Sequence, residues 1–138
     1  KNKNYILYGV FHRFVCDYRY SKKDLIKYLN ISDNLAKGRQ CEGGRQIIIK
    51  NKETTEFFKS WYDICIKDNY RYINDTPSII PNPKNFREHR HDQSIFSLLM
   101  KKYKYIDDNS INIVHNYISA PRKRGGDVEV KYLNWVKS

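Results

Sequence analysis

The chain has 138 residues, enough for one domain with a hydrophobic core of its own. Its composition, 40% hydrophobic and 30% charged, excludes a disordered or fibrous protein. No apolar run approaches the roughly 20 residues that span a bilayer, so we expect no membrane span. The net charge of +11 favours anionic partners, although the Lys, Asn, Ile and Tyr usage is also typical of an AT-rich genome.

The three cysteines are widely spaced, odd in number and without a CxxC pair. This pattern argues against a zinc site and predicts free thiols in a reducing compartment. The N-terminus lacks the apolar core and small-residue cleavage site of a signal peptide. The expected location is therefore the cytoplasm, or the host cytoplasm for a viral protein.

Two elements are predicted near the N-terminus. Tyr5–Val15 is rich in β-branched and aromatic residues, which predicts a strand with a turn near Gly9. The segment Ser21–Leu29 predicts a short helix. In that helix Ser21 and Asp24 have the spacing of a capping box, with Asp in place of Glu.

The middle of the chain alternates between loops and regular elements. We expect a loop over 30–44, then a short buried strand over Arg45–Lys50. A helix is predicted over 51–68, followed by an irregular stretch over 74–86, because three prolines fall there. The predicted helix has a core-facing stripe at helical spacing: Phe57, Phe58, Trp61, Tyr62 and Cys65.

The last third begins with an amphipathic helix that starts near Asp92. Short strands are expected over 105–108 and 111–118, then a basic turn over 119–130 and a final strand or helix over 130–138. Strands alternating with helices predict an α/β protein with a short mixed sheet flanked by helices. The apolar face of the amphipathic helix comprises Ile95, Leu98, Leu99 and Tyr103.

The stretch Arg90-His91-Asp92-Gln93 admits two interpretations. Asp92 could simply cap the helix, a contribution of about 0.5–2 kcal/mol. Capping leaves Arg90, His91 and Gln93 unexplained, whereas a basic residue at a helix start suits a bound anion. His91 and Asp92 are also competent metal ligands, and Asp92 could act as a base toward a hydroxyl.

A second polar stretch, Gln40-Cys41-Glu42-Gly43-Gly44, comes directly before the predicted buried strand. Two adjacent glycines allow a ligand to approach the backbone closely. An ordinary strand-entry turn with a solvated Glu42 explains the same residues, so both interpretations stay open.

Taken together, these segments resemble the C-terminal half of bacterial and viral glycosyltransferases with a GT-A-like fold. In that family a Gln-x-Glu-(Ala/Gly)-Gly segment enters a strand, and a helix with a central Trp follows. An Asp-x-Pro loop and a His-Arg-His-Asp-Gln-Ser-x-Phe-Ser-x-Leu block come next. The resemblance covers about residues 21–126, and the His-Asp-Gln block is its most specific part.

The resemblance implies transfer of a sugar from a nucleotide-sugar donor to a glycan or protein acceptor, with Mn²⁺ or Mg²⁺ on the diphosphate. The family's acidic Asp-x-Asp turn is absent from this sequence. We therefore expect residues 1–138 to form a single domain that lacks the N-terminal nucleotide-binding half. Such a chain could be truncated, could pair with a separate N-terminal half, or could be an inactive remnant.

The resemblance also implies roles for individual residues. Asp92 and Glu42 would be catalytic, and His91 would contact the metal or diphosphate. The remaining substrate contacts would be Gly43, Gly44, Gln93, Arg122, Lys123 and Arg124, the last three holding diphosphate oxygens.

The alternative class is a basic nucleic-acid-binding module. The +11 charge and twelve tyrosines suit single strands, which bind to cationic grooves with stacking aromatics. No RNP-like pattern, zinc finger or recognition helix supports that alternative, so nucleic acid is the less favoured partner.

Overall fold

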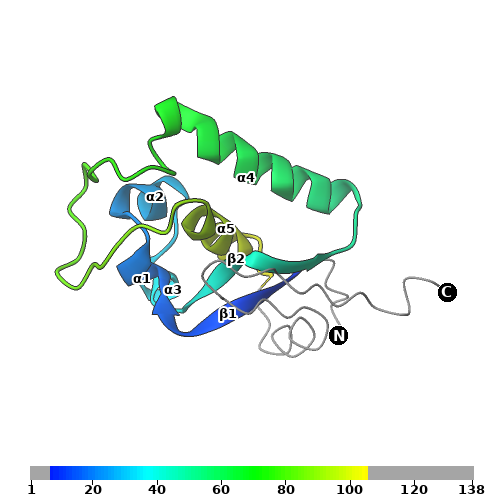
Figure 1. Cartoon of the computed structure of the whole chain (residues 1–138), viewed down its shortest axis with the longest axis horizontal. Helices are drawn as coiled ribbons and strands as arrows, with labels where there is room; N and C mark the ends of the chain where they lie inside the picture. The colour runs from blue at the N-terminus through cyan, green and yellow to red at the C-terminus, as the bar shows by residue number, and fades with distance from the viewer. Residues whose placement is uncertain (1–6, 106–138) are drawn as a thin grey trace, which may run out of the picture.

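The computed structural model describes residues 7–105, which form a mixed α and β structure (Figure 1). The strands and the basic turn predicted beyond residue 105, with Arg122, Lys123 and Arg124, lie outside the described residues. In chain order the elements are β1 (Leu7–Cys16), α1 (Asp17–Tyr20), α2 (Lys23–Tyr28), α3 (Asp33–Ala36), β2 (Arg39–Ile48), α4 (Lys52–Tyr70) and α5 (His91–Lys102).

Helix α5 lies at the centre of the described part of the chain. It packs against β2 on one side and α4 on the other, while β1 pairs with β2 (Figure 1). The sheet formed by residues 7–105 is a single antiparallel pair, so the predicted mixed sheet is not found there. The α and β content confirms the predicted class at this coarse level.

Strand β2 begins at Arg39, earlier than the predicted strand over Arg45–Lys50. The predicted loop over 30–44 contains α3 and the first half of β2, because pairing with β1 already begins at Arg39. Glu42, Gly43 and Gly44 therefore lie inside a strand rather than before one. The predicted burial of the following segment is also wrong, since Ile48 and Ile49 are 42% and 54% exposed.

Strand β1 runs through Gly9 without the predicted turn. The register with β2 shifts between Gly9 and Phe11 instead, which marks a bulge-like irregularity. A Cβ at Gly9 would lie 2.5 Å from the Cys41 Sγ atom. Glycine is thus required here by the close approach of the two strands.

The predicted helix over 51–68 is confirmed as α4, except that a kink at Lys67–Asn69 interrupts its last turn. Asn51 caps it: its side chain accepts from the Thr54 N–H, while the Thr54 hydroxyl accepts from the Asn51 N–H. Phe57 is buried against Phe96 with ring centroids 5.7 Å apart. Tyr62 departs from the predicted core stripe, because it is 64% exposed.

Helix α2 does not use the predicted capping box. It begins at Lys23, and its cap makes no side-chain hydrogen bond. The Ser21 hydroxyl donates to Asp17, and the Asp24 carboxylate accepts from the backbone N–H of Ile79 and Ile80. Asp24 thus binds the loop over residues 74–86, which we call the proline-rich loop, rather than the start of α2.

A fully buried polar cluster joins the first residue of α1 to β2 and α5. The Asp17 carboxylate lies 2.6 Å from the Lys101 Nζ atom, and the two side chains are 0% and 2% exposed. Asp17 also accepts hydrogen bonds from Ser21, Gln40 and Ser97. The charge of each buried group is therefore compensated, as burial requires.

The amphipathic helix predicted near Asp92 is confirmed as α5. Its core side chains include the predicted Ile95, Leu98 and Leu99, whereas Tyr103 follows the helix and is 48% exposed. No helix within residues 7–105 is both long and apolar enough to cross a membrane. All three cysteines are free thiols.

Candidate functional site

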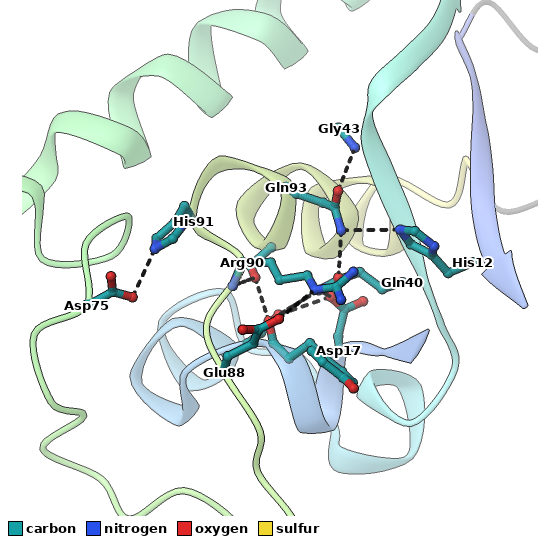
Figure 2. Close-up of polar contacts among 12 residues, drawn as sticks. His12, Asp17, Gln40, Gly43, Asp75, Glu88, Arg90, His91 and Gln93 are labelled. Atoms are coloured by element: carbon teal, nitrogen blue, oxygen red, sulfur yellow. Dashed lines mark hydrogen bonds and ion pairs between the residues drawn. The ribbon is translucent and has the colours of Figure 1, made fainter. Parts of the chain in front are cut away.

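Three segments distant in sequence contact the consecutive residues His91, Asp92 and Gln93; the contacts of His91 and Gln93 are drawn in Figure 2. The His91 Nε2 atom lies 2.9 Å from Asp75 Oδ1, in the loop before α5. Trp61 Nε1 of α4 donates to the Asp92 carbonyl at 3.1 Å. The remaining contact comes from β2, where the Gly43 N–H donates to Gln93 Oε1 at 3.3 Å, across 50 positions of sequence.

Gln93 connects this site to the buried polar cluster (Figure 2). Its Nε2 group donates to Gln40 Oε1 at 2.9 Å and lies 3.4 Å from His12 Nε2. The Gln40 amide in turn donates to Asp17 at 2.9 Å. Because both ends of the Gln93 amide contact the protein, its first role is to fix the start of α5 against β2.

The two glycines of β2 differ in their surroundings. A Cβ at Gly43 would meet Gln93 Cβ at 3.3 Å, so the missing side chain lets β2 and α5 approach each other. A Cβ at Gly44 would meet nothing within 4 Å. The open backbone that a ligand could approach is therefore at Gly44.

Asp92 does not cap α5. The cap position is Arg90, and no side chain there accepts a hydrogen bond from the first turn. The Asp92 carboxylate is exposed and makes no hydrogen bond or ion pair with any other residue in 7–105. A carboxylate left open on a well-packed helix start is available to a substrate.

His91 and His89 lie edge to face, with ring centroids 5.7 Å apart, but have different surroundings. His89 is buried; its Nδ1 accepts from the Lys22 N–H, and its Nε2 donates to the Tyr72 carbonyl. Burial lowers the pKa of His89 to about 4, so this ring is neutral and structural at pH 7. The exposed His91 is the histidine that can reach a ligand.

His91 also adopts a left-handed backbone, with φ of 51°. That conformation is unfavourable for a residue with a Cβ and costs glycine little. We therefore expect His91→Gly to be more stable than His91→Ala by about 1 kcal/mol, because only the alanine variant keeps a Cβ in the left-handed conformation. Both variants lose the Asp75 contact, so that loss cancels in the comparison. Urea unfolding of the two variants measures this difference, and equal midpoints would contradict the strained backbone.

Glu42 lies on β2 within an ion pair. Arg45 donates to both carboxylate oxygens, at 2.7 and 2.8 Å, and His12 Nδ1 lies 3.8 Å from Glu42. The hydrogen bond with Glu42 raises the pKa of Arg45, so the guanidinium stays charged. Glu42 and Arg45 thus present a paired charge, whereas Asp92 presents an open one.

The donors available to a divalent metal are few. Residues 7–105 contain no group of three or more His, Cys, Asp or Glu side chains arranged for a metal ion. His91 and Asp75 provide two adjacent donors, with side chains 50% and 79% exposed. Two protein donors suit Mg²⁺ or Mn²⁺ only where phosphate oxygens and water complete the coordination shell.

Two residues of the site were not predicted as such. The helical spacing predicts Trp61 in the core, and its ring does pack against the core beside Phe96, but its indole N–H also reaches the Asp92 carbonyl. His12 sits on β1, 81 positions before its partner Gln93. A single histidine within a strand carries no sequence signal that would place it beside α5.

No protein-family model matches the chain, and no curated protein or solved structure matches it.

Proposed function

We propose that this chain is the C-terminal portion of a GT-A-like glycosyltransferase, which transfers a sugar from a nucleotide-sugar donor to a glycan or protein acceptor. The observation that supports the proposal is the convergence on residues 91–93. The Glu-Gly-Gly strand, the Trp helix and the Asp-x-Pro loop each make a direct contact with the His-Asp-Gln block. The resemblance depends on these three segments, on the His-Asp-Gln block itself and on a basic Arg-x-Arg-Gly-like turn at 122–125, which lies outside the described residues.

In this proposal Asp92 is the base for the acceptor hydroxyl. The hydroxyl oxygen forms a bond to the anomeric carbon of the donor, the bond from that carbon to the diphosphate breaks, and the hydroxyl proton passes to Asp92. The Asp92 carboxylate suits this role because no partner within 7–105 holds it. Gln93 and Trp61 position it through the helix backbone.

The leaving diphosphate needs its developing charge neutralised. His91 and Asp75 would hold a divalent ion there, and that ion would supply the Lewis-acid stabilisation. Glu42 and the backbone of Gly43 and Gly44 would lie toward the sugar. Proposed diphosphate contacts outside the described residues are Arg122, Lys123 and Arg124.

Asp92→Asn should slow sugar transfer, measured as donor hydrolysis or transfer to acceptor, by about 10²–10⁴-fold, because the base is lost. Nucleotide affinity in this variant should stay within about 2-fold of the parent, since the diphosphate contacts are unchanged. Calorimetric titration with a panel of sugar nucleotides, with and without Mn²⁺, supplies the affinities.

His91→Ala should lose the Mn²⁺-dependent part of sugar-nucleotide binding, because one of the two proposed metal ligands is removed.

The matched control is Asp63→Asn, which neutralises another exposed carboxylate, on α4. It should change neither affinity nor rate. If the parent chain binds no sugar nucleotide with or without Mn²⁺, it has no working donor site, and sugar transfer by this chain alone is refuted. Tight polynucleotide binding that weakens steeply with salt and is unaffected by Asp92→Asn would favour the nucleic-acid module instead.

A further inference from the structure

A cavity of about 180 Å³ lies beside the candidate site, between the proline-rich loop and the start of α2. One of its residues, Asp75, is also the partner of His91 in the candidate site (Figure 2). The other lining residues are Lys22, Thr76, Pro77, Ser78, Asn82, Phe86, Glu88 and His89. The cavity is smaller than the roughly 300–1,000 Å³ of pockets for drug-sized ligands, so its ligand is small.

The cavity walls are held in place by hydrogen bonds from α2. The Asp24 carboxylate accepts from the Ile79 and Ile80 N–H groups, each at 2.8 Å. Asn82 Oδ1 accepts from the Lys23 N–H, also at 2.8 Å. These contacts make the proline-rich loop a preformed wall, which reduces the entropy cost of binding.

The side chains that line the cavity include more carboxylates than cations, whereas the whole chain is strongly basic. Two carboxylates line it: Asp75, whose Oδ1 atom contacts His91, and Glu88, which lies 3.4 Å from the Arg90 guanidinium. Lys22 is the one cationic side chain in the lining, because His89 is neutral at pH 7. The Lys22 ammonium donates hydrogen bonds to the carbonyls of Arg71 and Thr76, which leaves fewer of its N–H groups for an anion in the cavity. In a protein of net charge +11, this cavity is a poor site for a phosphate and a suitable one for hydroxyl groups.

We propose that this cavity binds one hexopyranose ring of the acceptor glycan, an inference that rests on the proposed function. The Glu88 carboxylate, and the Asp75 carboxylate oxygen that does not contact His91, would accept hydrogen bonds from ring hydroxyls. The Phe86 ring would contact the apolar face of the sugar. Because Asp75 also contacts His91, a ring held here would lie beside the His91–Asp75 pair of the candidate site.

The test uses a panel of methyl hexopyranosides with the full chain and no nucleotide. Saturation-transfer NMR should detect one or more of them with Kd on the order of 1 mM, as expected for a ligand of about 12 heavy atoms. The backbone amide shifts that change on sugar binding should fall at Lys22 and within residues 75–89. Inorganic phosphate at the same concentration should neither bind in the cavity nor displace the sugar.

Glu88→Ala should weaken the sugar by about 10-fold or more, because a charged acceptor is removed. Its side chain is 61% exposed, so the variant should fold normally. Phe86→Leu should also weaken binding while keeping an apolar wall. Glu56→Ala, which removes an exposed carboxylate on α4, is the matched control and should bind like the parent.

The proposal is overturned if no methyl hexopyranoside binds, if the shifts map away from Lys22 and residues 75–89, or if phosphate competes. Equal binding by Glu88→Ala and the parent would overturn it as well. Sugar binding without any sugar-nucleotide binding would uphold the cavity and refute the transferase function. Sugar-nucleotide binding without sugar binding would refute the sugar site in the cavity and leave the transferase function standing. The two proposals can therefore fail separately.

Discussion

Lys101→Met should lower the free energy of unfolding by about 3–5 kcal/mol, the usual effect of removing one partner of a buried ion pair. Lys101 and Asp17 are 2% and 0% exposed, and their charged atoms lie 2.6 Å apart. Without the ammonium, the Asp17 carboxylate would stay buried with only neutral donors from Ser21, Gln40 and Ser97. Urea unfolding followed by circular dichroism measures the loss.

Two comparisons separate this effect from a general loss of lysine. Lys59→Met, at an exposed position of α4, should change stability by no more than about 0.5 kcal/mol. The double variant Asp17→Leu with Lys101→Met should be less destabilised than Lys101→Met alone, because no unpaired charge remains. A cost below about 1 kcal/mol for Lys101→Met would mean that the ion pair is not buried in solution.

Lys101→Met should also disturb the candidate site. Asp17 orients the Gln40 amide, and Gln40 orients Gln93 at the start of α5. Weaker sugar-nucleotide binding by Lys101→Met under conditions where it stays folded would show that the buried cluster positions the site.

Periodic elements were predictable from the sequence because their signals are local. Helix α4 has an Asn51 cap and a stripe led by Phe57, and α5 has Ile95 and Leu98 on one face. Both patterns follow from the 3.6-residue turn and need no knowledge of distant residues. The strand through Glu42 was missed because Gly43 and Gly44 are weak strand formers, and only pairing with β1 makes this segment extended.

The buried polar cluster was not predictable for the opposite reason. Lysine is almost never fully buried, and the partner of Lys101 lies 84 positions away. The helix start at His91-Asp92-Gln93 was predicted and is found at α5, whereas the contact between Gln93 and the Gly43 strand was not predicted. The contacts from His12 and Trp61 depend on how β1 and α4 pack, which local sequence does not encode.

Asp24→Asn should lower stability by about 2 kcal/mol at pH 7 and loosen the cavity wall. Burial of this carboxyl opposes its ionisation, but hydrogen bonds from the Arg71 guanidinium and from the Ile80 and Ile79 N–H groups outweigh burial. They hold the pKa of Asp24 at about 2, below its ordinary value of 3.8. The folded state therefore binds the proton less readily than the unfolded state.

Because the folded pKa is depressed, the stabilisation from Asp24 is fully present above about pH 4 and is lost as the pH falls toward 2. Urea unfolding of the parent at several pH values should show this loss, and Asp24→Asn should show about 2 kcal/mol less of it. An unchanged pH profile in the variant would contradict the carboxylate's role. Since Asp24 binds the loop that carries Asp75 and Glu88, the variant should also bind methyl hexopyranosides more weakly at pH 7, with nothing in the cavity itself altered.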